Sequence, residues 1–196
     1  RDRPAAEAVE VLQQLIAMEA PIIGIGLDSA EVGNPPEQFA EVYALAAQHG
    51  LRRVAYAGEE GPAAYVIGAL DSLGVARVDH GIRSLEDAAL VERLRSIRMP
   101  LTVCPLSNVR LQAVPSIEAH PLPAMLEARL HVTINSDDPA YFGGYVDDNY
   151  RAVRDAFGLD RATLATLARN SITASFADDA RKQVLLEEIA AWEAAA

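Results

Sequence analysis

Short apolar runs alternate along this chain with longer stretches in which apolar residues recur at helical spacing. The short runs predict five strands, at residues 22–27, 53–57, 77–79, 101–104 and 131–135. The longer stretches predict helices at residues 37–49, 63–73, 122–128, 148–156, 161–171 and 177–193. A helix that Ser84 caps together with Glu86 and Asp87 is expected to run to about Arg95, and an amphipathic pattern through Val9, Leu12 and Ile16 predicts one more before the first strand. The alternation predicts an α/β protein.

Strands separated by helices of this length need crossover connections, which predict a parallel sheet. An open doubly wound sheet and a barrel both satisfy that pattern. No Gly-x-Gly-x-x-Gly follows the first strand, which weakens the dinucleotide-binding form of the open sheet. A barrel of the eight-stranded TIM type needs three further strands upstream. Because no linker or low-complexity tract interrupts the chain, residues 1–196 are predicted to form a single domain.

Composition narrows the possible partners and the location. The net charge of −11 argues against nucleic acid or an anionic membrane, because both attract basic surfaces. No apolar run approaches the roughly 18 residues that a membrane-spanning helix needs. The single cysteine, Cys104, suits a reducing cytoplasm, which is the expected location. The chain does not begin with methionine, so residues upstream are expected, and the oligomeric state stays open.

Three polar motifs each follow directly on a predicted strand. They are Ala57-Gly58-Glu59-Glu60-Gly61-Pro62, Val78-Asp79-His80-Gly81 and Asn135-Ser136-Asp137-Asp138-Pro139. The carboxyl ends of parallel strands share one rim, where α/β proteins bind their ligands. We therefore expect two acidic side chains, a histidine and an aspartate pair to converge in one pocket. Such a group of residues is typical of a metal-assisted hydrolase.

At these motifs the chain resembles the adenosine/adenine deaminase family, which are metal-dependent amidohydrolase barrels. The matching segments are residues 26–36, 57–62, 77–83, 100–108 and 135–145, in the order of the family. The Leu-Asp-Ser-Ala-Glu and Asp-Asp-Pro-Ala-Tyr-Phe-Gly-Gly-Tyr segments are more similar to the adenine deaminase-like branch. The resemblance implies a (β/α) TIM-barrel fold, with this chain supplying about five parallel strands and the first strands absent. It also implies zinc, and hydrolytic deamination of a small-molecule 6-aminopurine such as adenine, adenosine or an N6-substituted adenine.

The resemblance assigns the catalytic steps to Glu59 and His80. Glu59 corresponds to the acid that protonates the purine ring at N1, and partial burial at a strand end can raise the pKa of a carboxyl group. His80 corresponds to the histidine that orients the metal-bound water. The structural alternatives are an acid at a helix N-terminus and a core histidine bonded to a backbone carbonyl. The other histidines, His49, His120 and His131, are expected at the surface.

Further roles come from the same resemblance. Asp137 corresponds to the carboxylate metal ligand, and Asp138 to the residue that accepts a hydrogen bond near purine N7. This division requires the strand to end and the chain to turn here, since adjacent strand residues point to opposite sides. Pro139 is expected to supply that break. A simple Asp-Asp-Pro turn is the alternative. The remaining substrate-binding positions implied are Gly58, Asp28 and Ser29. Ser107 and Cys104 are not expected to act as nucleophiles, because no histidine–acid pair accompanies them, and Cys104 is expected to be a small buried core residue.

One departure from the family bears on the metal. The family has a metal-ligating histidine two residues before the Gly-Glu pair, and this chain has Tyr56 there. The paired histidine ligands of the family's first strand have no counterpart in this chain. Zinc sites of this kind rely on imidazole, and a phenol with a pKa of about 10 is a poor substitute. We predict that zinc binds weakly or not at all while Tyr56 holds the ligand position.

Three functional hypotheses follow. The first is a zinc-dependent purine deaminase, with upstream strands supplying the other ligands. The second is a catalytically inactive purine-binding or scaffold relative, marked by Tyr56. The third is an unrelated barrel enzyme that uses the acidic rim to hold magnesium. A smaller departure is Arg129, where the family often has the glycine that suits a left-handed helix cap, so arginine is expected to cost some stability.

Overall fold

The structure, a computed structural model, describes residues 1–195 of the chain. These residues form two compact units, which we call the first unit and the second unit and describe one at a time. The first unit is Arg1–Met99, and the second unit begins at Pro100. No helix in the described range is long and apolar enough to cross a bilayer. That residues 1–196 make a single domain stays a prediction.

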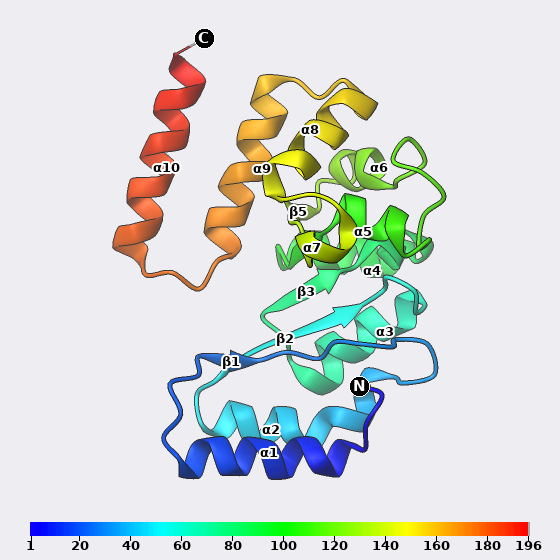
Figure 1. Cartoon of the computed structure of the whole chain (residues 1–196), viewed down its shortest axis with the longest axis vertical. Coiled ribbons are helices and arrows are strands. Elements are labelled where there is room, and N and C mark those ends of the chain that lie inside the picture. Colours follow the sequence, from blue (N-terminus) through cyan, green and yellow to red (C-terminus); the bar gives the residue numbers. More distant parts are fainter. Residues whose placement is uncertain (196) are drawn as a thin grey trace. The chain divides into compact units, whose positions relative to one another are not determined.

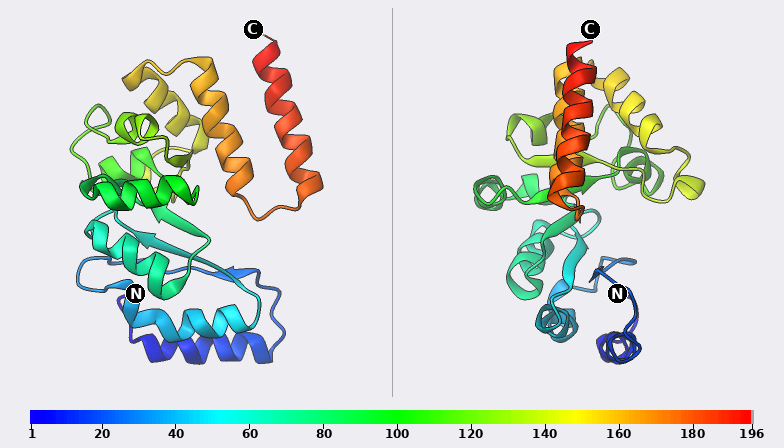
Figure 2. Two further views of the ribbon diagram at one scale, coloured as in Figure 1. Left: turned by 180° about the vertical axis from the view of Figure 1, so that it is seen from behind. Right: turned by 90° about the vertical axis from the view of Figure 1, so that its left-hand side faces the viewer.

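The first unit is built on three parallel strands, β1 (Gly24–Ile25), β2 (Arg52–Ala57) and β3 (Arg77–His80). Its helical segments are α1 (Ala5–Ala17), η1 (Pro36–Phe39), α2 (Ala40–Gln48), α3 (Ala63–Gly68), η2 (Ala69–Leu73), η3 (Ile82–Glu86) and α4 (Ala88–Ser96). Helix α1 packs beside α2, and α2 packs on β1 and β2 (Figures 1 and 2). The register pairs Ala57 with His80, so β2 and β3 end side by side.

Apolar side chains from the helices and strands form the core of the first unit. Fully buried members include Ala46, Ala55, Val66, Leu73 and Val78. Tyr43 is also buried, and its hydroxyl donates a hydrogen bond of 2.5 Å to the carbonyl of Val54. Burial raises the pKa of Tyr43, so the neutral phenol is retained. The buried residues of α2, which are Val42, Tyr43 and Ala46, recur at the spacing of one helix face.

Two local expectations for the first unit were wrong. The predicted strand at 22–27 pairs over only two residues, and the backbone there approaches β2 so closely that a Cβ on Gly24 would lie 2.6 Å from the carbonyl oxygen of Arg52. The N-cap of α4 is Asp87 alone, and not Ser84 together with Glu86 and Asp87. The Asp87 carboxylate accepts hydrogen bonds from the N–H groups of Ala89 and Leu90, while Ser84 lies within η3. A carboxylate also gains from the positive end of the helix dipole.

The second unit has two parallel strands, β4 (Pro100–Val103) and β5 (His131–Ile134), which end in register at Val103 and Ile134. Its helices are α5 (Pro105–Arg110), α6 (Leu122–Glu127), α7 (Pro139–Phe142), α8 (Val146–Phe157), α9 (Arg161–Ala174) and α10 (Asp179–Ala194). Helices α9 and α10 lie side by side (Figure 1). The sequence predicted α6, α8, α9 and α10 but missed α5 and α7. Both short helices have proline at their start, where its missing N–H costs nothing.

Candidate functional site

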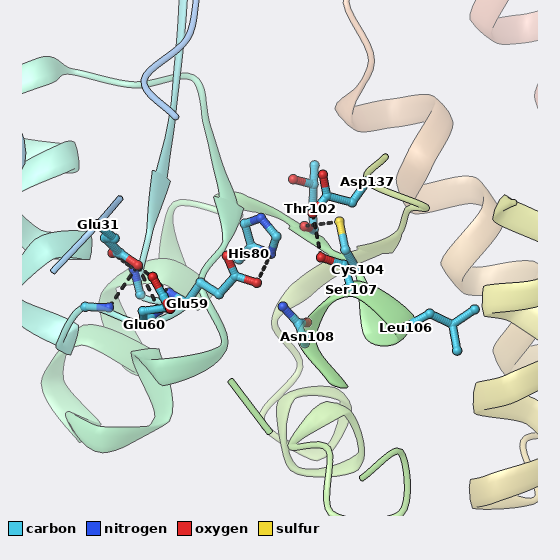
Figure 3. A network of polar contacts seen from close by, with 12 residues as sticks. Glu31, Glu59, Glu60, His80, Thr102, Cys104, Leu106, Ser107, Asn108 and Asp137 are labelled. Atoms are coloured by element: carbon cyan, nitrogen blue, oxygen red, sulfur yellow. Dashed lines mark hydrogen bonds and ion pairs between the residues drawn. The ribbon is translucent and has the colours of Figure 1, made fainter. Parts of the chain in front are cut away.

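The carboxyl ends of β2 and β3 bring Glu59 and His80 together in the first unit. His80 is the last residue of β3 and pairs with Ala57, the last residue of β2. The Nδ1 atom of His80 lies 3.2 Å from Oε1 of Glu59 (Figure 3). His80 is 1% exposed and Glu59 7% exposed. A carboxyl group and an imidazole in contact at this depth are equipped to hold and transfer a proton.

Tyr56 lies against the same histidine. Its ring centroid is 4.6 Å from that of His80, and the two planes meet at 73° in an edge-to-face arrangement. Tyr56 is half-buried on β2. The predicted ligand position therefore places an aromatic ring beside His80, where the family pattern has a second imidazole.

The loop after β2 is organised around a residue that the sequence analysis did not single out, Glu31. Its carboxylate accepts hydrogen bonds from four consecutive backbone N–H groups, those of Gly58, Glu59, Glu60 and Gly61 (Figure 3). We call these four N–H groups the amide nest. Gly58 has φ 75°, a left-handed conformation that suits glycine. A pattern could have indicated Glu31, since it closes the Leu-Asp-Ser-Ala-Glu segment on which the resemblance rests.

Asp28 and Ser29 lie on the loop that carries Glu31, between β1 and η1. Both side chains are exposed to solvent. Ser29 has φ 73°, a left-handed backbone that is unusual for a residue with a side chain. The structure thus places these two predicted substrate-binding residues on a loop that the amide nest connects to Glu59.

In the second unit, the chain turns sharply after β5, as the predicted roles of Asp137 and Asp138 require. Strand β5 ends at Ile134, and Asp137 has φ 56°, so the chain has left the extended conformation before Asp138. Asp138 then takes the N-cap position of α7, with its side chain exposed. Pro139 begins α7 and does not make the break that the sequence analysis assigned to it.

Ser107 contacts Asp137 directly. The Ser107 hydroxyl, which is fully buried, donates a hydrogen bond of 2.7 Å to Oδ2 of Asp137 (Figure 3). Cys104 is also buried, and its thiol lies 3.6 Å from the carbonyl of Thr102. These contacts give Ser107 an orienting role toward a carboxylate and make Cys104 a core residue, as the sequence analysis expected.

Three of the predicted site residues have a left-handed backbone conformation that a helix end does not explain. Seven non-glycine residues between 1 and 195 have positive φ. Four of them directly follow the C-caps of helices α1, α4, α5 and α6, where this conformation is common: Glu19, Arg98, Gln112 and Arg129. The other three, Ser29, His80 and Asp137, lie at or shortly after strand ends. Residues held in sparsely populated conformations cluster at functional sites, and each of these three is a predicted site residue.

The expectation that His120 lies at the surface was wrong. It is 3% exposed, and its Nδ1 accepts a hydrogen bond of 3.0 Å from the N–H of Leu122. Its Nε2 lies 3.1 Å from Oδ1 of Asn108, so Nε2 carries the hydrogen and donates it. Burial lowers the pKa of His120 to about 4. The neutral ring therefore anchors Asn108 on α5, the helix that also carries Ser107.

Comparison with known proteins decides the family. The adenosine deaminase family model matches residues 1–192. The chain belongs to the adenosine deaminase family. It is similar to the adenine deaminase of Streptomyces coelicolor, with 62% identity over 179 residues that make up 91% of this chain and 53% of that enzyme. Identity to the adenine deaminase of Sphingopyxis alaskensis is 56% over 95% of this chain and 55% of that enzyme.

Solved structures agree with this assignment. The crystal structure of adenine deaminase from Arthrobacter aurescens matches with a TM-score of 0.96 and 60% identity, over 97% of this chain and 58% of that chain. A cog1816 amidohydrolase from Burkholderia ambifaria, solved with bound Zn, matches with a TM-score of 0.89 and 30% identity, over all of this chain and 57% of that one. These matches confirm the predicted fold class, an α/β barrel type to which this chain contributes five strands. The chain spans about half the length of the relatives it matches.

The residues of this chain do not by themselves fit the zinc site of the family. Asp137 offers a carboxylate that Ser107 already orients. Tyr56 offers a phenol packed on His80, in the position where the family pattern has imidazole. Zinc favours thiolate, imidazole and carboxylate ligands, and a neutral phenol is a poor donor. Glu59 and His80 belong to the first unit, Asp137 and Asp138 to the second. Their convergence on one cavity, and their individual roles, stay predictions.

Proposed function

We propose that the protein containing this chain is a hydrolase that deaminates a 6-aminopurine, adenine in the first place. The reaction adds the oxygen of water to C6, breaks the bond from C6 to the amino nitrogen and releases ammonia. The observation that carries the proposal is the buried Glu59–His80 contact at the ends of two parallel strands. High identity to adenine deaminases over nearly the whole chain supports the same substrate class.

Glu59 and His80 divide the proton transfers in this proposal. Protonation of ring N1 withdraws electrons from C6 and makes that carbon open to attack, and the Glu59 carboxyl group donates this proton. The 3.2 Å contact with Glu59 fixes the orientation of the His80 ring, which holds the attacking water and stabilises the charge that develops. Both side chains are almost completely buried, which strengthens these electrostatic effects.

Other residues of the chain orient the purine. The exposed carboxylate of Asp138 accepts a hydrogen bond from the purine near N7. Gly58, whose left-handed backbone suits glycine, contacts the ring through its main chain. Asp28 and Ser29 contact the far edge of the ring from their own loop. This arrangement binds a planar base and leaves the exact purine to residues at the mouth of the pocket.

Water needs activation to act as the nucleophile, and a zinc ion lowers the pKa of bound water to about 7. Asp137 is the residue of this chain that would hold such an ion, together with ligands from outside it. Tyr56 supplies no imidazole, so we infer that zinc affinity is reduced. Tyr56 also favours a second candidate function, a purine-binding relative without catalytic activity. The cytoplasm remains the predicted location of either form.

One assay separates the two candidates. The full-length protein is purified and its zinc content is measured, together with the release of ammonia from adenine. Stoichiometric zinc and turnover are expected for the deaminase, and retained adenine binding without either is expected for the inactive relative. In the second case, Tyr56→His should restore both zinc and turnover. Failure of that variant to gain either property would overturn the deaminase proposal.

A further inference from the structure

Glu31 is a buried carboxylate with an unusual number of backbone partners. It is 3% exposed. Its Oε1 accepts from Gly58 N at 2.5 Å, and its Oε2 accepts from three further N–H groups, those of Glu59 at 3.0 Å, Glu60 at 2.9 Å and Gly61 at 2.9 Å. Successive N–H groups that point into one concavity bind anions, and here the anion is a side chain of the same protein. Figure 3 shows the carboxylate inside this ring of donors.

The amide nest is shaped to receive this carboxylate. Gly58, at φ 75°, turns its N–H toward Glu31. Gly61 leaves the space that the carboxylate fills, because a Cβ there would lie 2.7 Å from Oε1 of Glu31 and 2.5 Å from the Tyr65 ring. Charged acceptors make shorter and stronger hydrogen bonds to N–H groups than neutral ones do. Four donors on one carboxylate therefore restrain the backbone of residues 58–61 at every position.

A second set of contacts connects the same two loops. The Arg1 guanidinium donates to the carbonyl of Asn34 at 3.0 Å and to the carbonyl of Tyr56 at 2.7 Å. Burial lowers the pKa of Arg1, and the negative charge of Glu31 opposes that shift. The Arg1 guanidinium thus joins the loop at 28–34 to the end of β2, and the Glu31 carboxylate joins the same loop to the amide nest.

We propose that Glu31 is a positioning residue for deamination, and this inference rests on the proposed function. The N–H of Glu59 is one of its four partners, so the Glu31 carboxylate sets the backbone from which Glu59 reaches His80. Asp28 and Ser29 lie on the loop that carries Glu31. The Glu31 carboxylate therefore fixes the loop that carries Asp28 and Ser29 relative to the backbone of the proton donor, Glu59.

The first test measures how strongly Glu31 restrains the backbone of residues 58–61, and it needs no enzymatic activity. In the full-length protein, Glu31→Gln keeps the size of the side chain but turns an NH2 group toward donors that need an acceptor. Amide hydrogen exchange at residues 58–61, followed by NMR, is expected to accelerate about tenfold or more. Amides in the middle of α2 should keep their rates. The control is Glu41→Gln, which removes an exposed carboxylate from the same unit. Exchange at 58–61 within about twofold of wild type would overturn the inference.

The second test measures whether Glu31 affects catalysis through Glu59. In the Tyr56→His background, Glu31→Gln is expected to lower kcat on adenine by about 10- to 100-fold, since small displacements of a reacting group have effects of this size. The same substitution added to Glu59→Gln should lower kcat no further, because the group it positions is already lost. Additive losses would overturn the inference and leave Glu31 a purely structural residue. Gly61→Ala keeps the carboxylate but crowds it, and should behave like Glu31→Gln if that variant folds poorly.

The two tests fail in different ways. Absence of ammonia release from adenine in the Tyr56→His protein would overturn the proposed function and with it the catalytic part of this inference. Unchanged exchange at 58–61 in Glu31→Gln would overturn the inference alone, since the deamination assay does not depend on it.

Discussion

The ring of Tyr56 lies edge-on against the imidazole of His80, with 4.6 Å between ring centroids. Tyr56 comes two residues before Gly58, in the position where the family pattern has a metal-ligating histidine. The contact keeps His80 packed and buried without an imidazole neighbour. We infer that tyrosine at this position preserves the packing around His80 but supplies no imidazole to a metal ion.

Zinc affinity tests this interpretation. Tyr56→His is expected to raise the affinity of the full-length protein for zinc by about tenfold or more, because imidazole is a preferred ligand. Tyr56→Phe removes only the hydroxyl and is the matched control. If the phenol is no ligand, this control should leave affinity unchanged in a chelator competition assay. A large loss of zinc in Tyr56→Phe would show that the tyrosine itself coordinates the ion.

The hydrogen bond from Ser107 to Asp137 predicts a loss of stability in Ser107→Ala. Removing a buried donor from a carboxylate should lower the free energy of unfolding by about 1–2 kcal/mol, as measured by urea denaturation. Ser96→Ala serves as control, because the Ser96 hydroxyl bonds an exposed carbonyl at the end of α4. That control should change stability by less than about 0.5 kcal/mol. Equal effects of the two substitutions would contradict an orienting role for Ser107.

Replacing Arg129 by glycine is expected to stabilise the fold. It has φ 57° and follows the C-cap of α6, where its N–H donates to Leu126 and the N–H of Leu130 donates to Met125. This is the Schellman geometry, which glycine adopts without steric cost. Arg129→Gly should raise the free energy of unfolding by about 1 kcal/mol. Arg129→Ala keeps the Cβ and should bring no such gain, so a stabilised alanine variant would point to another cause.

His120 predicts a dependence of stability on pH. Burial lowers its pKa from 6.5 to about 4, so between these values the unfolded chain binds more protons than the folded one. The stabilising contribution is complete above pH 6.5 and is lost as the pH falls through about 4, at most about 3 kcal/mol in all. His120→Asn should flatten the fall in unfolding free energy over this range. An unchanged slope in His120→Asn would contradict this assignment.

Most helices and strands were predictable because their signals are local. Apolar periodicity placed β2, β3, β4 and β5 within a residue or two of their observed bounds, and it placed the long helices of the second unit. The short α5 and α7 were missed, and Pro139, the first residue of α7, was interpreted as a break although proline suits the first position of a helix. The cap of α4 was predicted only as a group of residues, because Ser84 and Asp87 both suit an N-cap and only the backbone geometry distinguishes them.

The amino-acid sequence by itself determined the family and the candidate residues at the strand ends, because the order and spacing of motifs are properties of the linear sequence. Tertiary structure decided which residues support them. Glu31 lies 27 positions from its first partner in the amide nest, and His120 lies 12 from Asn108. Pairings of this kind depend on how the chain folds back on itself. The left-handed backbone of Ser29, His80 and Asp137 could not be predicted from the sequence either. No residue type there requires this conformation, and only the surrounding contacts hold it in place.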